Sequence, residues 1–117
     1  MREALLVDDD RGFVETLATL LRFEGYAVVP EFTFDSAVRY LRISTPDVLI
    51  TDIAIGPTNG WELVRYANQH KPDLPVVVVT GDADLFAAKW EYFHTPVFLK
   101  PFDPVELFAY LRQHGRC

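Results

Sequence analysis

Short apolar runs that end abruptly in polar residues constrain most strongly what this chain can fold into. Such runs occur at 4–7, 26–29, 48–50, 76–79 and 97–99. Runs of this length suit strands that are buried on both faces of a parallel sheet. Between them apolar residues recur at helical spacing, as Leu17 and Leu21 do within 11–23. Strands that alternate with helices predict an α/β fold with a doubly wound parallel sheet.

The helices of this pattern have recognisable beginnings and ends. Gly25 is a plausible stop for the first helix, and Pro30 limits the strand that follows it. Asn59 is placed to cap the third helix. Asp103 followed by Pro104 is a typical start for the last one. The sequence therefore predicts helices at 11–23, 34–43, 61–70, 84–92 and 104–114.

Length, charge and cysteine content narrow the class of protein. The 117 residues fit a single domain, 1–117, without linker or repeat. A net charge of −6 argues against nucleic-acid binding, which needs clustered Lys and Arg. The only cysteine is Cys117, so neither an internal disulfide nor a cysteine zinc site is expected. No apolar run approaches the ~20 residues needed to span a bilayer, and we expect a cytoplasmic protein without membrane contact.

Polar side chains follow the predicted strands at the point where each one ends. Asp8 and Asp9 end the first strand, Asp52 the third, Thr80 the fourth and Lys100 the fifth. Ligands of open α/β sheets bind outside the carboxyl ends of the strands. These side chains, far apart in the sequence, are therefore expected to converge on one surface pocket.

The residue types in this predicted pocket favour phosphoryl chemistry. Two carboxylates ~4 Å apart repel by ~4 kcal/mol at an effective dielectric near 20, and Mg²⁺ removes that penalty while keeping several waters. A carboxylate can itself accept a phosphoryl group. Lys100 offers a positive charge to a phosphate oxygen, and Thr80 offers a hydroxyl donor.

Four segments together carry a resemblance to a known family. They are Leu5-Leu6-Val7-Asp8-Asp9-Asp10, Asp47-Val48-Leu49-Ile50-Thr51-Asp52, Val77-Val78-Val79-Thr80-Gly81 and Phe98-Leu99-Lys100-Pro101-Phe102. In this order and spacing they resemble the signature segments of response-regulator receiver domains over essentially the whole chain. The resemblance implies a flavodoxin-like, three-layer fold with five parallel strands in the order 2-1-3-4-5.

The resemblance also implies a role for each matching residue. Asp52 corresponds to the phosphoacceptor, and Mg²⁺ would be the cofactor. Asp9 corresponds to the carboxylate that binds the metal directly. Asp8 would support it, largely through water, and the backbone carbonyl of Ala54 would be a further ligand.

The remaining implied roles concern the phosphate and the partners. Thr80 corresponds to the switch hydroxyl and Lys100 to the phosphate-binding lysine, and the bond before Pro101 is expected to be cis. The phosphoryl donor would be a sensor histidine kinase or a histidine phosphotransfer protein that docks near the first helix. Output, including a homodimer, would use the face between the fourth and fifth helices.

The sequence departs from the family pattern at two places. Ala54 occupies a position that is often polar, and Pro57 lies one place later than usual. We hypothesise that Ala54 and Asp82 together tune hydrolysis of the phosphoryl group. Val97 stands where an aromatic residue is usual, with Phe98 next to it, so the usual threonine–aromatic coupling is expected to be altered or absent.

Simpler interpretations and competing functions remain beside these. Asp10 is better explained as a helix cap, and His70, His94 and His114 as surface residues. The aromatic residues near the fourth helix, Trp90, Tyr92 and Phe93, are expected to pack in the core, and if exposed they would mark a partner or dimer surface. One competing function is a binding module that keeps the fold without using phosphate. The other is a phosphatase of the haloacid dehalogenase type, with Asp8 as nucleophile.

Overall fold

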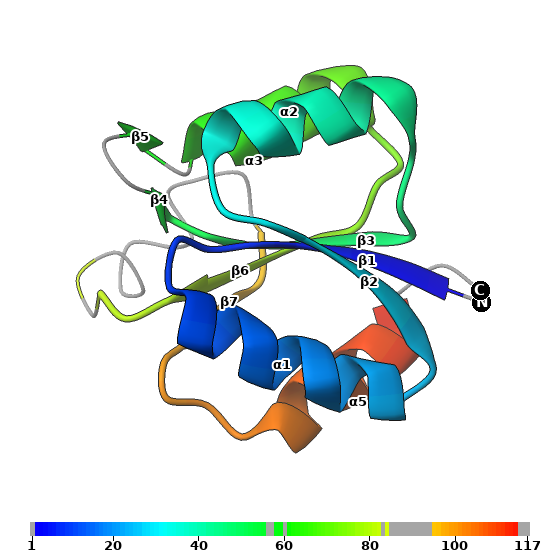
Figure 1. Ribbon diagram of the computed structural model, residues 1–117, viewed down its shortest axis with the longest axis vertical. Coiled ribbons are helices and arrows are strands. Elements are labelled where there is room, and N and C mark those ends of the chain that lie inside the picture. Colours follow the sequence, from blue (N-terminus) through cyan, green and yellow to red (C-terminus); the bar gives the residue numbers. More distant parts are fainter. Residues whose placement is uncertain (1, 56–57, 60, 83, 85–94, 115–117) are drawn as a thin grey trace.

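The chain folds around a five-stranded parallel sheet, seen in a computed structural model that describes residues 2–55, 58–59, 61–82, 84 and 95–114. The strand order is β2-β1-β3-β6-β7 (Figure 1). In chain order these strands are the first to the fifth of the predicted sheet, so the predicted order 2-1-3-4-5 is confirmed. The strands are β1 (Arg2–Val7), β2 (Tyr26–Glu31), β3 (Val48–Asp52), β6 (Val76–Thr80) and β7 (Val97–Leu99).

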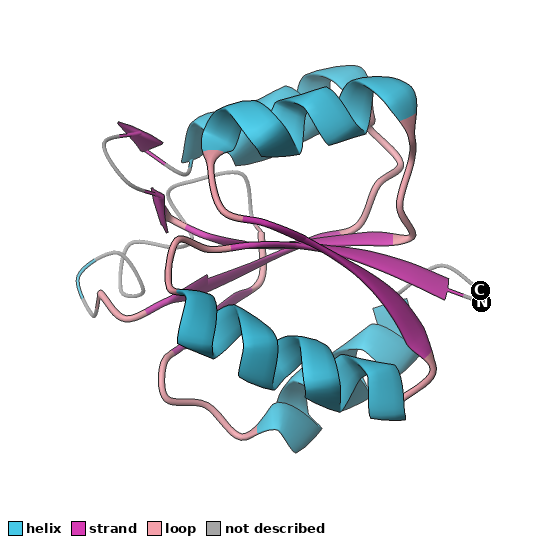
Figure 2. Ribbon diagram, viewed as in Figure 1, coloured by secondary structure: helices cyan, strands magenta, loops and turns pink. Residues whose placement is uncertain are grey.

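Helices cover both faces of the sheet. Helices α2 and α3 lie on one side of it, and α1 and α5 lie on the other (Figures 1 and 2). The bounds of all four match the sequence prediction: α1 (Arg11–Phe23), α2 (Phe34–Ile43), α3 (Trp61–His70) and α5 (Pro104–His114).

The two helical layers enclose two separate cores because successive strand residues point to opposite faces. In β1, Leu5 and Val7 belong to the core under α2 and α3. Leu6, which lies between them, belongs to the core under α1 and α5. Both β3 and β6 are buried along their whole length, as expected for the centre of a parallel sheet.

Side-chain caps begin the first two helices. The Asp10 carboxylate accepts a hydrogen bond from the Phe13 backbone N–H at 3.1 Å, which supports the prediction of Asp10 as a cap. Thr33 caps α2 in the same way through the Ser36 N–H at 3.1 Å. Gly25 follows α1 with φ of +96°, a left-handed conformation that favours glycine.

Strand β2 continues past the point where the sequence predicted its end. Pro30 was expected to limit the strand, but pairing with β1 extends to Glu31. Because β2 is an edge strand, a proline can face the open side without removing a hydrogen bond from the ladder. The Glu31 carbonyl, facing β1, accepts from the Asp8 N–H at 3.2 Å.

The segment after Asp52 contains two very short strands instead of the predicted loop. Strand β4 (Ala54–Ile55) pairs antiparallel with β5 (Thr58–Asn59). The predicted fourth helix lies outside the described residues except for Asp84, and so do its three aromatic residues, His94 and Cys117. Within the described part of the chain, no helix has the length and hydropathy to cross a membrane.

Candidate functional site

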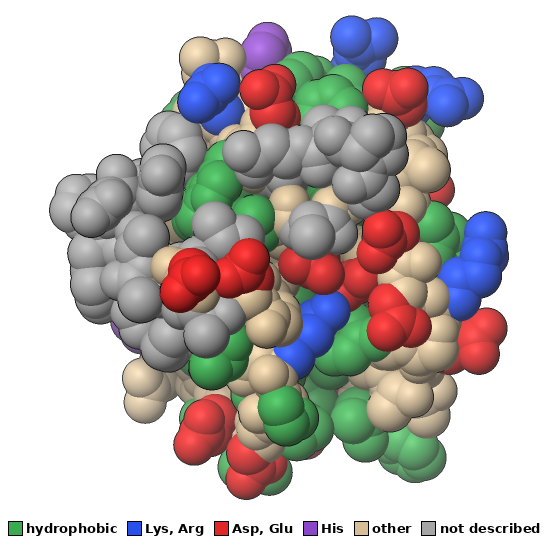
Figure 3. All heavy atoms as spheres, turned by 90° about the vertical axis from the view of Figure 1, so that its left-hand side faces the viewer, with side chains coloured by type: hydrophobic (Ala, Val, Ile, Leu, Met, Phe, Trp, Pro, Cys, Tyr) green, Lys and Arg blue, Asp and Glu red, His purple; other side chains and the backbone are tan. Residues whose placement is uncertain are grey.

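The carboxyl ends of four parallel strands meet at one edge of the sheet and line a cavity of about 360 Å³. This edge is at the left of Figure 1 and faces the viewer in Figure 3, where acidic side chains gather around a basic one. The cavity contains every polar residue predicted from the strand ends, together with three neighbours from the adjoining turns. Its lining residues are Asp8, Asp9, Asp10, Asp52, Thr80, Gly81, Asp82 and Lys100.

Lys100 bridges the first and third strands. Its Nζ donates to Asp8 Oδ2 at 2.6 Å and to Asp52 Oδ2 at 3.1 Å. Asp8 is completely buried, whereas Asp52 keeps 7% of its surface exposed to the cavity. Because both ion pairs are largely shielded from solvent, they are stronger than surface pairs of the same length.

Burial and charge act against each other at this bridge. Burial raises the pKa of Asp8, and the negative charge of Asp52 adds to it, while the hydrogen bond from Lys100 opposes both. Burial alone would lower the pKa of Lys100, but the hydrogen bond to Asp8 and the charge of Asp52 hold it above its usual value. The site thus holds more negative charge than one ammonium group neutralises, which favours a further cation.

Thr80 is the last residue of β6. It lies at the edge of the cavity and is buried. Its hydroxyl oxygen accepts a hydrogen bond from the Asp82 backbone N–H at 3.1 Å, and its carbonyl accepts from the Lys100 N–H at 2.7 Å. Asp82 in turn accepts from the Asp84 N–H at 2.9 Å. Thr80 therefore connects the turn after β6 to the end of β7, and its hydroxyl can still donate its own proton.

The oxygen-rich lining has the chemistry that Mg²⁺ prefers. Among the described residues, however, no three His, Cys, Asp or Glu side chains are arranged to hold a metal ion. The three predicted carboxylates, those of Asp8, Asp9 and Asp52, thus do not form a preassembled metal site. Two of them, Asp8 and Asp52, are paired with the Lys100 ammonium instead. Mg²⁺ usually keeps several waters and needs few protein ligands, so the donor set still fits this ion.

Two predicted site residues lie beside the cavity. Ala54 begins β4 two residues after Asp52, and its backbone is described but its side chain is not. The Lys100–Pro101 bond is cis. It directs the chain from the end of β7 toward α5.

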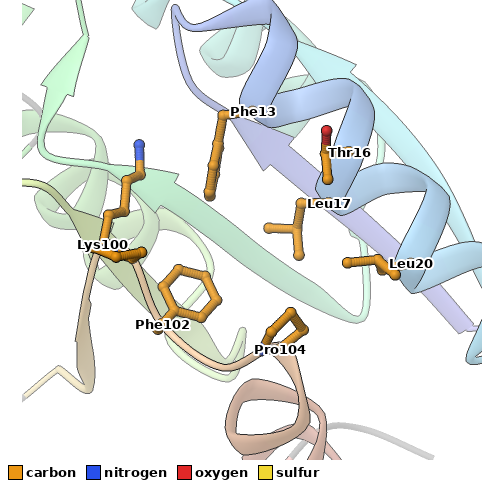
Figure 4. A pocket seen from close by; sticks show the side chains of 8 residues that line it. Phe13, Thr16, Leu17, Leu20, Lys100, Phe102 and Pro104 are labelled. Atoms are coloured by element: carbon orange, nitrogen blue, oxygen red, sulfur yellow. The ribbon is translucent and has the colours of Figure 1, made fainter.

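A second, mainly apolar cavity of about 450 Å³ lies between α1 and the segment that joins β7 to α5 (Figure 4). Phe13, Leu17 and Leu20 line it from α1, and Phe102 and Pro104 from the other side. Lys100 lines both cavities. The sequence prediction placed residues 11–23 in a helix but did not foresee this connection through Lys100.

A family model for the response regulator receiver domain matches residues 4–112. The chain belongs to this family. Receiver domains are modules of two-component response regulators that act in signalling rather than as conventional enzymes. The implied fold and the positions of the strand-end residues fit this assignment.

The curated relatives of this receiver domain are longer regulators. It is 28% identical over 117 residues to the transcriptional regulatory protein YvrH of Bacillus subtilis, covering 94% of this chain and 47% of that protein. It is 32% identical over 112 residues to CreB of Escherichia coli, covering 92% of this chain and 48% of that protein. The receiver domain thus spans about half the length of these relatives.

Solved receiver structures have the same fold. A putative response regulator from Chloroflexus aurantiacus superimposes with a TM-score of 0.86 at 30% identity, covering 96% of this chain and 95% of that one. The response regulator TrrA from Thermotoga maritima, solved in complex with Mg²⁺ and beryllofluoride, gives 0.86 at 23% identity, covering 97% and 98%.

Strand β7 carries its aromatic residue at position 98, next to Val97, where the family resemblance implied an aromatic side chain. Val97 is buried in the core under α2 and α3. Phe98 packs against the core under α1 and α5, as strand alternation requires. Its ring lies 5.7 Å from that of Phe102 and 6.1 Å from that of Tyr110. The aromatic side chain thus lies on the opposite face of the sheet from Val97.

Proposed function

We propose that residues 1–117 form one phosphoacceptor receiver domain that takes a phosphoryl group onto Asp52 in a Mg²⁺-dependent reaction. The observation that carries this proposal is the bridge from Lys100 to both Asp8 and Asp52 at the floor of an acidic cavity. Asp52 is held beside a cation and is still exposed to the cavity. A nucleophilic carboxylate needs both properties.

The proposed step is an in-line displacement at phosphorus. An Asp52 carboxylate oxygen forms the new bond to phosphorus while the bond to the leaving group of the donor breaks. Lys100 is close enough to transfer one of its hydrogen bonds to a phosphoryl oxygen. Thr80 can donate its hydroxyl proton to another, since the backbone of Asp82 uses only its oxygen.

The proposed metal site is built from oxygen ligands of the same cavity. Asp9, Asp52 and the backbone carbonyl of Ala54 would bind Mg²⁺, with Asp8 contributing through water. Bound by these residues, Mg²⁺ would supply positive charge to phosphoryl oxygens. The acidic lining of the cavity supports a cation requirement, as does the Mg²⁺–beryllofluoride complex of TrrA.

The proposed donor is a phosphohistidine on a sensor histidine kinase or a histidine phosphotransfer protein. The apolar cavity beside α1 offers a docking place for its apolar side chains, and Lys100 connects that cavity to the acidic one. Output, including a homodimer, is assigned to the face between the fourth helix and α5. We expect this cytoplasmic domain to contact neither nucleic acid nor membrane, in keeping with its net charge of −6.

A phosphate-independent binding module is the second candidate. The position of Val97 favours it, because an aromatic residue of the usual output coupling is missing there. Lys100, Asp52 and Thr80, placed together at one cavity, argue against it. No observation favours the haloacid dehalogenase phosphatase, whose nucleophile would be the completely buried Asp8.

Intact-protein mass spectrometry tests the proposal. The protein is incubated with acetyl phosphate, with and without Mg²⁺, as wild type and as Asp52→Ala and Asp52→Asn. We expect a gain of one phosphoryl group that requires Mg²⁺ and is lost in both variants. A wild type that gains no mass and binds no beryllofluoride would favour the phosphate-independent module. A modification found on Asp8 would favour the phosphatase.

A further inference from the structure

Lys100 makes a third close contact, which is with an aromatic ring. Its Nζ lies 3.9 Å from the centroid of the Phe13 ring, within the range of a cation–π interaction. Figure 4 shows the Lys100 side chain running alongside this ring at the end of the apolar cavity. The ammonium is thus held by two carboxylates and one aromatic face, and Phe13 has no polar atom of its own to take part in the reaction.

The three contacts differ in what the proposed reaction does to them. Phosphorylation replaces the Asp52 carboxylate by an acyl phosphate, so the contact at 3.1 Å changes its partner. The contact with Asp8 would be shared with any metal ion that this carboxylate helps to hold. The Phe13 ring is neither phosphorylated nor a metal ligand, so its contact with Lys100 can persist throughout. A lysine side chain has a long, flexible stem, so a contact that persists can hold its ammonium in place between the two states.

The ring itself is well fixed. Phe13 lies in the first turn of α1, and its own N–H is bound by the capping Asp10. The Phe102 ring packs edge-on against it, with centroids 6.2 Å apart and planes at 74°. Phe102 contacts Phe98, and Phe98 contacts Tyr110 of α5. Three elements thus brace the ring that faces Lys100.

We propose that Phe13 is a positioning residue for phosphoryl transfer, holding the Lys100 ammonium between Asp8 and Asp52 through the face of its ring. This inference rests on the proposed function of Asp52. It predicts that the ring matters through Lys100 and not through its bulk. Substitution by leucine should preserve most of the apolar packing and remove the cation–π contact.

This effect is measured as the affinity of the whole chain for beryllofluoride in the presence of Mg²⁺. Titration calorimetry gives that affinity. We expect Phe13→Leu to weaken binding about three- to tenfold, the range that corresponds to one partly exposed cation–π contact. Phe13→Tyr, which keeps the ring face, should restore the affinity. With acetyl phosphate as donor, Phe13→Leu should also slow phosphorylation of Asp52.

A double-mutant cycle distinguishes positioning from packing. In a Lys100→Met background the Phe13→Leu substitution should have no further effect on beryllofluoride affinity, because no ammonium remains to be positioned. Phe32→Leu is the matched control. It removes a ring that lies 4.0 Å from the Arg11 guanidinium and so takes part in a cation–π contact with a different cation.

The outcomes separate the two proposals. A wild type that is phosphorylated on Asp52 while Phe13→Leu binds beryllofluoride normally would overturn the role of Phe13 alone. An equal loss with and without Lys100, or a Phe13→Tyr as weak as Phe13→Leu, would do the same and leave only a packing role. A wild type that takes up neither phosphoryl group nor beryllofluoride would overturn the proposed function, and the role of Phe13 with it.

Discussion

The Lys100 ammonium lies closer to the completely buried Asp8, at 2.6 Å, than to Asp52, at 3.1 Å. The shorter contact is with the carboxylate that has no exposed surface. Asp8 therefore depends more on Lys100 for its charge balance than the proposed phosphoacceptor does. The longer contact is the one that an incoming phosphoryl group has to replace.

Removing this cation should destabilise the protein and increase its dependence on Mg²⁺. We expect Lys100→Met to lower the free energy of unfolding by about 2 to 3 kcal/mol without metal, because it removes the ammonium group that pairs with two buried carboxylates. Saturating Mg²⁺ should restore a large part of that loss by supplying the missing positive charge. Urea unfolding with and without Mg²⁺ measures both effects. Lys71→Met, which changes a lysine bound to Thr45, is the control.

Asp9 and Asp10 are adjacent but should respond in opposite ways to substitution. Asp10→Ala removes the cap of α1 and should cost about 1 kcal/mol of stability, with Mg²⁺ affinity nearly unchanged. Asp9→Ala should chiefly reduce Mg²⁺ affinity. Thermal unfolding and Mg²⁺ titration of the two variants provide the comparison. A loss of Mg²⁺ affinity in Asp10→Ala would show that its capping role is not the only one.

Ala54 and Asp82 should set the lifetime of the phosphoryl group. An amide at position 54 can orient a water molecule, so Ala54→Asn should speed hydrolysis. Asp82→Ala removes an exposed carboxylate from the cavity and should slow hydrolysis, since a carboxylate can orient or deprotonate the attacking water. The decay of the phosphorylated mass after removal of the donor gives the rates. Asp73→Ala is the control, and unchanged rates in both test variants would refute the hypothesis.

A hydrogen bond from Tyr40 of α2 to Glu3 of β1 should make part of the stability dependent on alkaline pH. Burial, and then the hydrogen bond to Glu3, raise the pKa of Tyr40 above its usual value. The contribution is therefore complete below the unfolded-state pKa of about 10 and disappears as pH rises through the higher folded value.

Tyr40→Phe should lower the free energy of unfolding by about 1 kcal/mol at neutral pH. The difference from wild type should shrink above pH of about 10. Urea unfolding between neutral and strongly alkaline pH tests this, with Tyr66→Phe as a control for the loss of a hydroxyl group. A difference that does not change across that range would contradict the assignment.

Much of the fold could be predicted from the sequence because its elements obey local rules. The four described helices begin and end at the residues that apolar spacing indicates, and Asp10 caps α1 as predicted, but Asn59, the predicted cap of α3, lies in β5. Strand ends were less predictable. Arg2 and Glu3 are polar, yet they extend β1 because Tyr26 and Ala27 of β2 pair with them. The pairing of β4 with β5 also depends on a partner strand and has no signal in either two-residue segment.

The candidate site divides in a similar way. Residue types at the strand ends predicted which side chains share the cavity, because parallel strands bring their carboxyl ends together. They did not predict that Lys100 would bridge Asp8 and Asp52, since a flexible side chain can reach several partners. The contact of Lys100 with Phe13 was equally hidden. An apolar residue at a helical position indicates burial but not the cation above its ring.

Pro30 has a consequence for how this domain behaves in a crowded cell. The Glu31 carbonyl faces β1, so the backbone groups of Pro30 face the open edge of β2, where the missing N–H interrupts the row of donors. An unprotected sheet edge is a template for strands of other chains and hence for aggregation. The exposed proline makes that edge a poor template. Pro30 thus leaves the pairing of β2 with β1 intact and helps to keep the sheets of separate molecules from joining.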